Sequence, residues 1–159
     1  MLKIHPATRD DVATLLMLIR QLAAFEKKPH KAIVTEADLL RDGFGSQPKF
    51  RALIADWNGQ PAGYASFYYF YSTFLGRPAL FLEDLFVLDQ LRGKGIGKAL
   101  LASVAKLAVE EGCFGLRWEV LDWNQPAIDF YEKLGATFLD ERKVVSFDEE
   151  TMRRVAGSR

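Results

Sequence analysis

Residues 79–98 read ALFLEDLFVLDQLRGKGIGK and place three structural signals next to one another. The apolar run from Ala79 to Leu88 has the length and composition of a β-strand. The glycine-rich turn from Arg92 to Gly97 follows it and opens a helix. That helix has a buried stripe at helical spacing, made of Ile96, Leu100, Leu101, Val104, Leu107 and Ala108. The stretch therefore predicts a strand–turn–helix unit around which the remaining elements are arranged.

The flanking sequence predicts an α+β domain with a mainly antiparallel sheet. The pair Asn58-Gly59 between two apolar runs is typical of a β-hairpin. Thr8 and Thr35 are expected to cap two helices before the hairpin. The remaining strands are expected at residues 2–6, 50–57, 62–71, 114–121 and within 136–147, and further helical segments at 124–134 and 148–155. No linker or repeat interrupts the chain, so we expect one domain over residues 1–159.

Composition restricts the class of protein. The chain has 21 Lys plus Arg and 21 Asp plus Glu, so its formal net charge is zero. A neutral chain has no broad attraction for nucleic acid or an anionic membrane surface, and neither is expected as a partner. The single cysteine, Cys113, excludes an intrachain disulfide. The N-terminus lacks the pattern of a signal peptide and no stretch has the length of a membrane span, so we expect a cytoplasmic protein.

The turn from Arg92 to Lys98 has the properties of an anion site. The start of a helix presents unpaired N–H groups and the positive end of the macrodipole, and glycines allow close approach of phosphate oxygens. The spacing excludes a P-loop, because Arg92 and Ala99 stand where a glycine and a Ser or Thr are needed. It also excludes the dinucleotide pattern, because that pattern requires a glycine at position 98, where this chain has Lys98. A glycine-rich turn without a ligand remains the alternative.

Arg92-x-x-Gly95-x-Gly97 after an apolar strand resembles the acyl-CoA signature of the GNAT superfamily of N-acetyltransferases. Further segments resemble the spermidine/spermine (diamine) acetyltransferases and the related thialysine N-acetyltransferases, in the same order over the whole chain. These segments are Phe25-Glu26, Thr35-Glu36, Asp42-Gly43-Phe44-Gly45, Leu82-Glu83-Asp84, Asp122-Trp123-Asn124-Gln125, Phe130-Tyr131 and Leu134-Gly135-Ala136.

The resemblance implies a GNAT fold, in which two middle strands of the sheet splay and helices flank it, and acetyl-CoA as co-substrate without a metal. It also implies a homodimer, to which the aromatic segment from Tyr64 to Phe74 could contribute, although packing within the sheet explains that segment equally well. The donor-binding residues carried over from the family are Leu85, Phe86, Val87, Arg92, Gly93, Lys94, Gly95, Ile96, Gly97, Lys98, Asn124, Gln125, Pro126, Ala127 and Tyr131.

Two carboxylates interrupt the apolar strand before the turn. Burying a carboxylate without a partner costs free energy, so an acid here indicates either a partner that compensates its charge or a functional role. From the residues alone, a structural role and a catalytic role are equally favoured for Glu83 and Asp84; the resemblance favours Glu83 as the base and a structural role for Asp84. Arg117 and Glu119 share one strand face, which is either solvated or in contact with substrate. Through the resemblance, the expected substrate contacts are Phe25, Glu26, Glu83, Arg117, Trp118 and Glu119.

Tyr131 lies on the apolar stripe of the helix expected at 124–134, which by itself favours a packing role. The resemblance assigns the general acid to Tyr131. Cys113 has no histidine near it in sequence, and a small buried thiol is the better interpretation. We therefore predict direct attack of the amine on the thioester in a ternary complex rather than an acyl-enzyme.

The expected acceptor is the amine of a small molecule: a diamine, a thialysine-like amine or an amino-acid-like amine. Lys27 and Lys28 follow Phe25-Glu26 where the polyamine enzymes tend to be acidic, so spermine is the weaker candidate. Two other functions stay open from the sequence. One is an acyl-CoA-binding sensor without turnover, and the other is acetylation of peptide or protein amines.

Overall fold

The computed structural model describes residues 1–157 and contains two compact units, Met1–Glu119 and Val120–Arg159. Five strands and three helices of four residues or more build the first unit, together with three short 3₁₀ turns. Its elements are β1 (Leu2–Pro6), α1 (Val12–Phe25), α2 (Glu36–Phe44), β2 (Arg51–Trp57), β3 (Gln60–Ser72), β4 (Arg77–Val87), α3 (Ile96–Glu110) and β5 (Leu116–Trp118). The second unit holds α4 (Gln125–Lys133) and α5 (Glu149–Ala156).

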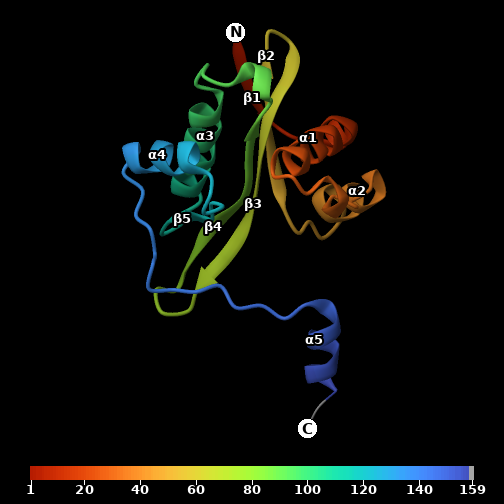
Figure 1. Ribbon diagram of the computed structural model, residues 1–159, viewed down its shortest axis with the longest axis vertical. Coiled ribbons are helices and arrows are strands. Elements are labelled where there is room, and N and C mark those ends of the chain that lie inside the picture. The colour runs from red at the N-terminus through yellow and green to blue at the C-terminus, as the bar shows by residue number, and fades with distance from the viewer. Residues whose placement is uncertain (158–159) are drawn as a thin grey trace. The chain divides into compact units, whose positions relative to one another are not determined.

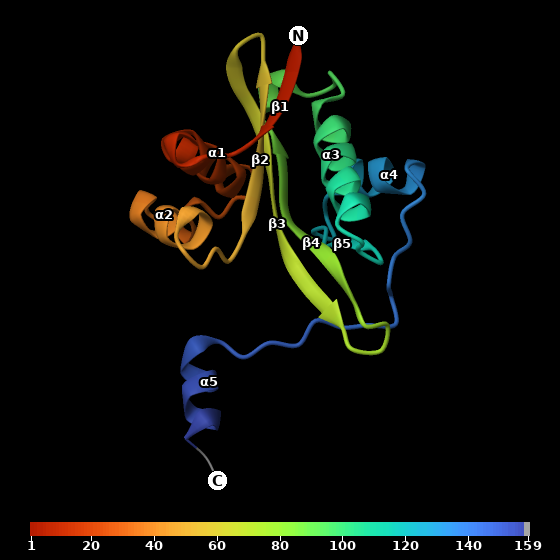
Figure 2. The same cartoon turned by 180° about the vertical axis from the view of Figure 1, so that it is seen from behind.

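The sheet of the first unit has the strand order β1-β2-β3-β4-β5. The first three pairings are antiparallel, and β4 pairs with β5 in parallel. Helices α1 and α2 lie over one face of this sheet and α3 over the other, as both views show (Figures 1 and 2). The predicted α+β fold with a mainly antiparallel sheet is confirmed.

Local sequence signals explain the element boundaries. Asn58 and Gly59 both have positive φ, 51° and 81°, as a two-residue hairpin turn between β2 and β3 requires. Thr35 caps α2, since its side chain accepts the Asp38 amide at 3.1 Å while the Asp38 carboxylate accepts the Thr35 amide at 2.9 Å. Gly112, with φ 73°, follows the end of α3.

The core of the first unit lies between the sheet and its helices. Leu15 and Leu18 of α1 are fully buried, as are Leu100 and Val104 of α3. Leu18 packs in one cluster with Val12, Leu15, Leu16, Leu39, Ala52, Tyr64 and Phe86. Burial of this apolar surface fixes both helix layers against the sheet that carries the glycine turn.

The strand β5 is shorter than the expected 114–121. It pairs only with Leu80, Phe81 and Leu82 of β4, so the last part of β4, from Glu83 to Val87, runs beyond the end of β5. The two parallel strands therefore share only a short ladder, as expected for a sheet that opens at this point. Because β5 ends the strand order, the opening lies at the edge of the sheet rather than in its middle.

The expected strands within residues 136–147 do not form, which corrects the sequence prediction. This segment has no regular structure, and the side chains of Val144, Val145 and Phe147 are largely exposed. A strand needs a neighbour for its backbone N–H and C=O groups, and the second unit provides none among its described residues. Helix α5 begins at its cap Asp148, whose side chain accepts the Thr151 amide at 2.8 Å.

Within residues 1–157, every helix is too short or too polar to cross a lipid bilayer.

Candidate functional site

The glycine turn ends β4 and opens α3 as predicted. Gly93 and Gly95 have φ of 79° and 80°, in the left-handed region that glycine adopts without strain. Gly95 is the N-cap of α3 and offers no side chain to the first helical amides. Among the described residues, no hydrogen-bond acceptor is found for the backbone amides from Gly93 to Lys98. The turn therefore presents a row of free N–H groups at a helix start, which suits an anion.

The strand that leads into this turn lies close to its neighbour β3. Val87 pairs with Gly63, and a Cβ on Gly63 would come within 2.3 Å of the Phe86 carbonyl oxygen. The close approach depends on the absence of a side chain at that position. Leu85, Phe86 and Val87 thus lie on the part of β4 that is paired with β3 on one side and extends beyond β5 on the other.

The three cations of the turn have different surroundings. Lys98 is exposed. The Lys94 ammonium lies 5.5 Å from the centre of the Trp57 ring. Arg92 bends back toward β4, where its Nε donates to the Val87 carbonyl oxygen at 3.3 Å and its guanidinium lies 4.2 Å from the centre of the Phe25 ring.

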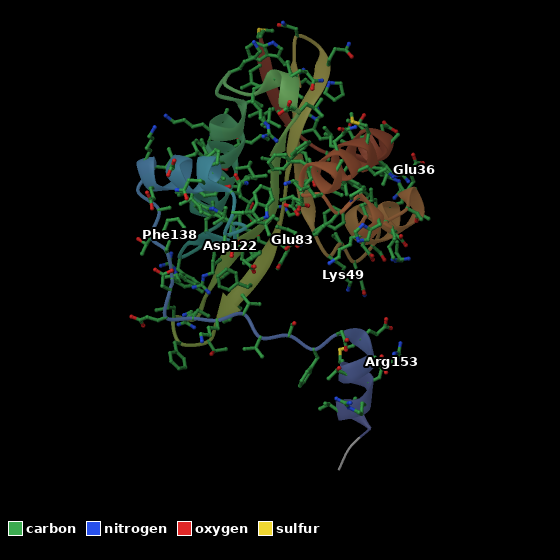
Figure 3. All side chains as sticks on the ribbon, in the orientation of Figure 1. Glu36, Lys49, Glu83, Asp122, Phe138 and Arg153 are labelled. Atoms are coloured by element: carbon green, nitrogen blue, oxygen red, sulfur yellow. The ribbon has the colours of Figure 1, made fainter. Side chains whose placement is uncertain are left out.

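Glu83 occupies an irregularity in β4. Leu82 pairs with Phe67 and Asp84 pairs with Ser66, so Glu83 is the extra residue of a β-bulge and has no partner on β3. Figure 3 marks its position part-way along β4. A bulge changes the direction of the side chains around it, so the simple alternation expected for Glu83 and Asp84 does not apply here.

The Glu83 carboxyl has a perturbed ionisation, although the residue as a whole is exposed. Partial burial of the carboxyl raises its pKa, and the charges of Asp84 and Glu119 raise it further. The charge of Glu26 acts in the same direction, while a hydrogen bond from the Tyr68 hydroxyl, at 3.5 Å, lowers the pKa. A carboxylate with a raised pKa is a better base at neutral pH than an ordinary glutamate.

Asp84 belongs to a buried polar group. The Ser66 hydroxyl donates to its carboxylate at 2.8 Å. Burial raises the pKa of Asp84, and hydrogen bonding to Ser66 lowers it in part. The Tyr64 hydroxyl next to this pair is fully buried, and no described residue forms a hydrogen bond of acceptable geometry with it. Burial is the main cause of the raised pKa of Tyr64, and the nearby charge of Asp84 raises it further. The structural role expected for Asp84 agrees with this arrangement.

The residues expected to contact substrate lie on three elements of the first unit. Phe25 is the last residue of α1, and Glu26 is its C-cap. Arg117 and Trp118 are in β5, and the Arg117 guanidinium lies 4.9 Å from the centre of the Phe70 ring. Glu119 follows β5 and is exposed. Glu26 and Glu119 each lie close enough to Glu83 for their charges to raise its pKa.

The second unit contains the remaining candidates. Asn124 caps α4 and accepts the Ala127 amide at 3.4 Å, and Gln125, Pro126 and Ala127 form the first turn. Tyr131 is buried, and its ring lies 5.4 Å from that of Phe130. Burial raises the pKa of Tyr131, so its hydroxyl is protonated at neutral pH and is a proton donor.

Cys113 is half-buried and follows α3, which ends at Glu110. Burial and the nearby Glu111 charge raise the pKa of the thiol. A thiol with a raised pKa is a poor nucleophile, which agrees with the inert role expected for it.

Comparison with known proteins decides the family. Residues 15–136 match the model of the Acetyltransferase (GNAT) family, which is more than half of the chain. The chain belongs to the GNAT acetyltransferase family. This acetyltransferase is 39 % identical to a thialysine N-epsilon-acetyltransferase of Mus musculus, over 98 % of its own length and 97 % of the relative. It is 36 % identical to a spermidine/spermine N(1)-acetyltransferase-like protein 1 of Homo sapiens, over 89 % of its length and 21 % of that longer chain.

Solved structures share the fold of the acetyltransferase. An integron cassette protein from V. cholerae aligns with a TM-score of 0.84 at 24 % identity, covering 99 % of this chain and 98 % of that one. An aminoglycoside N-acetyltransferase in complex with CoA aligns with a TM-score of 0.72 at 20 % identity, covering 94 % and 95 %. At these identities the likeness shows the fold alone.

Two features of the candidate site were not predicted from the sequence. The buried group of Tyr64, Ser66 and Asp84 was not anticipated, because Tyr64 and Ser66 lie in an aromatic strand that reads as ordinary packing. The contact of Arg92 with Phe25 was also not anticipated, because the two residues are far apart in sequence and both were read as parts of separate motifs. Of these residues, only Asp84 was singled out in the sequence, because it is an acid within an apolar run.

Proposed function

We propose that this acetyltransferase transfers an acetyl group from acetyl-CoA to the amine of a small molecule, by direct attack in a ternary complex. The observation that carries the proposal is the turn from Gly93 to Lys98, whose unpaired amides start a helix at the end of β4. A diphosphate is the ligand that such a turn suits best. The names of the relatives, which act on thialysine or on polyamines, support a small amine as acceptor.

The donor would be held by backbone groups and by the first turn of α4. The amides from Gly93 to Lys98 bind the diphosphate, with Lys94 and Lys98 adding positive charge. Leu85, Phe86 and Val87 pair with the pantetheine arm through their backbone groups. Asn124, Gln125, Pro126 and Ala127 line the thioester end. Acetyl-CoA supplies an activated acetyl group and a thiolate leaving group.

Two side chains would handle protons during transfer. A primary amine with a pKa of about 10.4 is neutral in roughly one molecule in a few thousand at pH 7, so a base has to take its proton before attack. Glu83 takes it, directly or through water, and its raised pKa suits that task. Tyr131 donates its proton to the departing sulfur, since its hydroxyl is kept protonated by burial.

The acidic surroundings of Glu83 favour a cationic acceptor. The charges of Glu26 and Glu119 both act on Glu83, and an ammonium group next to Glu83 would compensate them. Lys27 and Lys28 follow Glu26 directly, which disfavours a substrate with several separated positive charges. We propose a diamine, a thialysine-like amine or an amino-acid-like amine ahead of spermine. A panel of amines ranked by kcat/KM tests this, and spermine as the best substrate would contradict it.

The two compact units would act as one domain over residues 1–159. We propose a cytoplasmic location for the protein. The family match spans residues 15–136 and so crosses the boundary between Glu119 and Val120, which supports a common function.

We further propose a homodimer. The side chains of Tyr64 and Phe67 in the aromatic segment are buried in the core, but that of Phe74 is fully exposed. Val144 and Val145 are largely exposed as well, and burial between two copies of the chain would remove this apolar surface from water. Sedimentation velocity is expected to show a dimer that Phe74→Ser or Val145→Asp weakens. A wild-type monomer at micromolar concentration would contradict the proposal.

The central experiment is a thiol-release assay with acetyl-CoA and a panel of amines. Turnover that depends on the amine identifies an enzyme, whereas CoA binding without turnover would identify a sensor. Acetylation of peptides in preference to all small amines would identify the third alternative. Glu83→Gln and Tyr131→Phe are the matched variants, because each keeps the size of the side chain and removes the proton chemistry.

A further inference from the structure

The side chain of Arg92 bends back toward β4 and the end of α1. Its Nε donates to the Val87 carbonyl oxygen at 3.3 Å and lies 3.9 Å from the Asp89 carboxylate. Its guanidinium carbon lies 4.2 Å from the centre of the Phe25 ring and 5.8 Å from that of Phe86. These contacts engage one edge and one face of the guanidinium and compensate part of its charge.

These contacts connect the glycine turn to two elements that have different tasks in the proposed reaction. Phe25 ends α1 and precedes Glu26 on the acceptor side. Phe86 and Val87 belong to the part of β4 proposed to pair with the donor. The Phe25 and Phe86 rings also lie 6.3 Å apart, and both belong to the packing around the buried core. Arg92 therefore holds the end of α1 and the end of β4 in one arrangement.

The chemistry of the contact requires an arginine. A planar guanidinium stacks on an aromatic ring with its face and donates hydrogen bonds from its edge at the same time. A lysine keeps the charge but has no planar face and no fixed donor direction. The carbonyl of Val87 has two lone pairs, so the bond from Arg92 leaves one available while it fixes the orientation of the group.

We propose that Arg92 is a positioning residue: it orients the Val87 carbonyl and the Phe25–Glu26 corner for transfer, and it is not a ligand of the diphosphate. This inference rests on the proposed use of acetyl-CoA. The exposed Lys98 of the same turn supplies the charge toward the diphosphate.

The test compares acetyl-CoA with acetyl-pantetheine, which keeps the thioester and the pantetheine arm but lacks the diphosphate. Arg92→Lys and Arg92→Gln are expected to lower kcat/KM by the same factor with both donors, roughly 10- to 100-fold as for a misplaced reacting group. Lys98→Gln is the matched control and is expected to lower kcat/KM with acetyl-CoA alone. A loss in the Arg92 variants confined to acetyl-CoA, or no loss with either donor, would overturn the proposal.

A second measurement does not depend on the reaction. In a double-mutant cycle of Arg92→Lys and Phe25→Leu, thermal unfolding is expected to show non-additive changes, because the two side chains are in contact. Additive changes would refute the contact that the proposal needs. If the wild-type protein neither bound nor cleaved acetyl-CoA while the coupling persisted, the proposed function would fail and the contact itself would stand.

Discussion

Gly63 is the position at which the smallest change should disturb the donor strand. In Gly63→Ala, the new Cβ would lie 2.3 Å from the Phe86 carbonyl oxygen and 3.1 Å from Val87 Cα. Real Cβ contacts are not shorter than 3.0 Å, so β3 and β4 would have to separate by about 0.7 Å at a buried site. Both obstructing atoms belong to the backbone and cannot rotate away. Overpacking of this kind costs about 2–3 kcal/mol.

Thermal unfolding and donor kinetics measure the effect. A loss of about 2–3 kcal/mol lowers Tm by roughly 4–12 °C in a chain of this size. The KM for acetyl-CoA is expected to rise as well, since Val87 moves with β4. Gly115→Ala is the matched control, because nothing lies within 4 Å of the Cβ that it would add. A Tm of Gly63→Ala within 1 °C of the Gly115→Ala value would refute the close approach of the two strands.

Three further predictions concern the proton chemistry. Tyr131→Phe is expected to lower kcat by about 10²–10⁴-fold in stopped assays, while calorimetry shows an unchanged affinity for acetyl-CoA. Unchanged turnover would remove Tyr131 from the mechanism. Glu83 has to be ionised to accept a proton, so wild-type kcat/KM should fall as the pH drops below its raised pKa. Glu83→Gln should be slow and should not show this fall at low pH. A variant with the same pH profile as the wild type would exclude Glu83 as the base. The folded-state pKa of Asp84 lies above its unfolded value, so its ionisation costs stability as the pH rises through the folded-state pKa. Asp84→Asn should therefore raise Tm at about pH 7 and lose this advantage below about pH 4, and a lower Tm at neutral pH would show that the charge stabilises the fold.

The local signals in the sequence were sufficient for most of the first unit. Asn58-Gly59 predicted the hairpin because few other residue pairs accept two positive φ values in succession. The glycine turn and the start of α3 followed from Gly95, whose left-handed backbone ends the preceding segment. Thr35 and Asp38 marked the start of α2 through a reciprocal pair of hydrogen bonds within four residues. In each case the interaction that fixes the structure lies within the motif itself.

Features that depend on distant residues could not be predicted in the same way. The bulge at Glu83 arises from the register between β3 and β4, which the sequence of β4 alone does not specify. The bend of Arg92 toward Phe25 depends on the packing of α1 against the sheet. The apolar pattern of residues 136–147 resembles a strand, but a strand also requires a pairing partner, and the pattern gives no information about one.

Calorimetric titration of the purified chain with CoA tests the central claim most directly. The free amides of the turn from Gly93 to Lys98 predict saturable binding at one site per chain, weakened as ionic strength rises because the ligand is a diphosphate. The absence of any heat of binding at millimolar CoA, with the protein folded by circular dichroism, would contradict both the donor site and the acetyl transfer proposed from it.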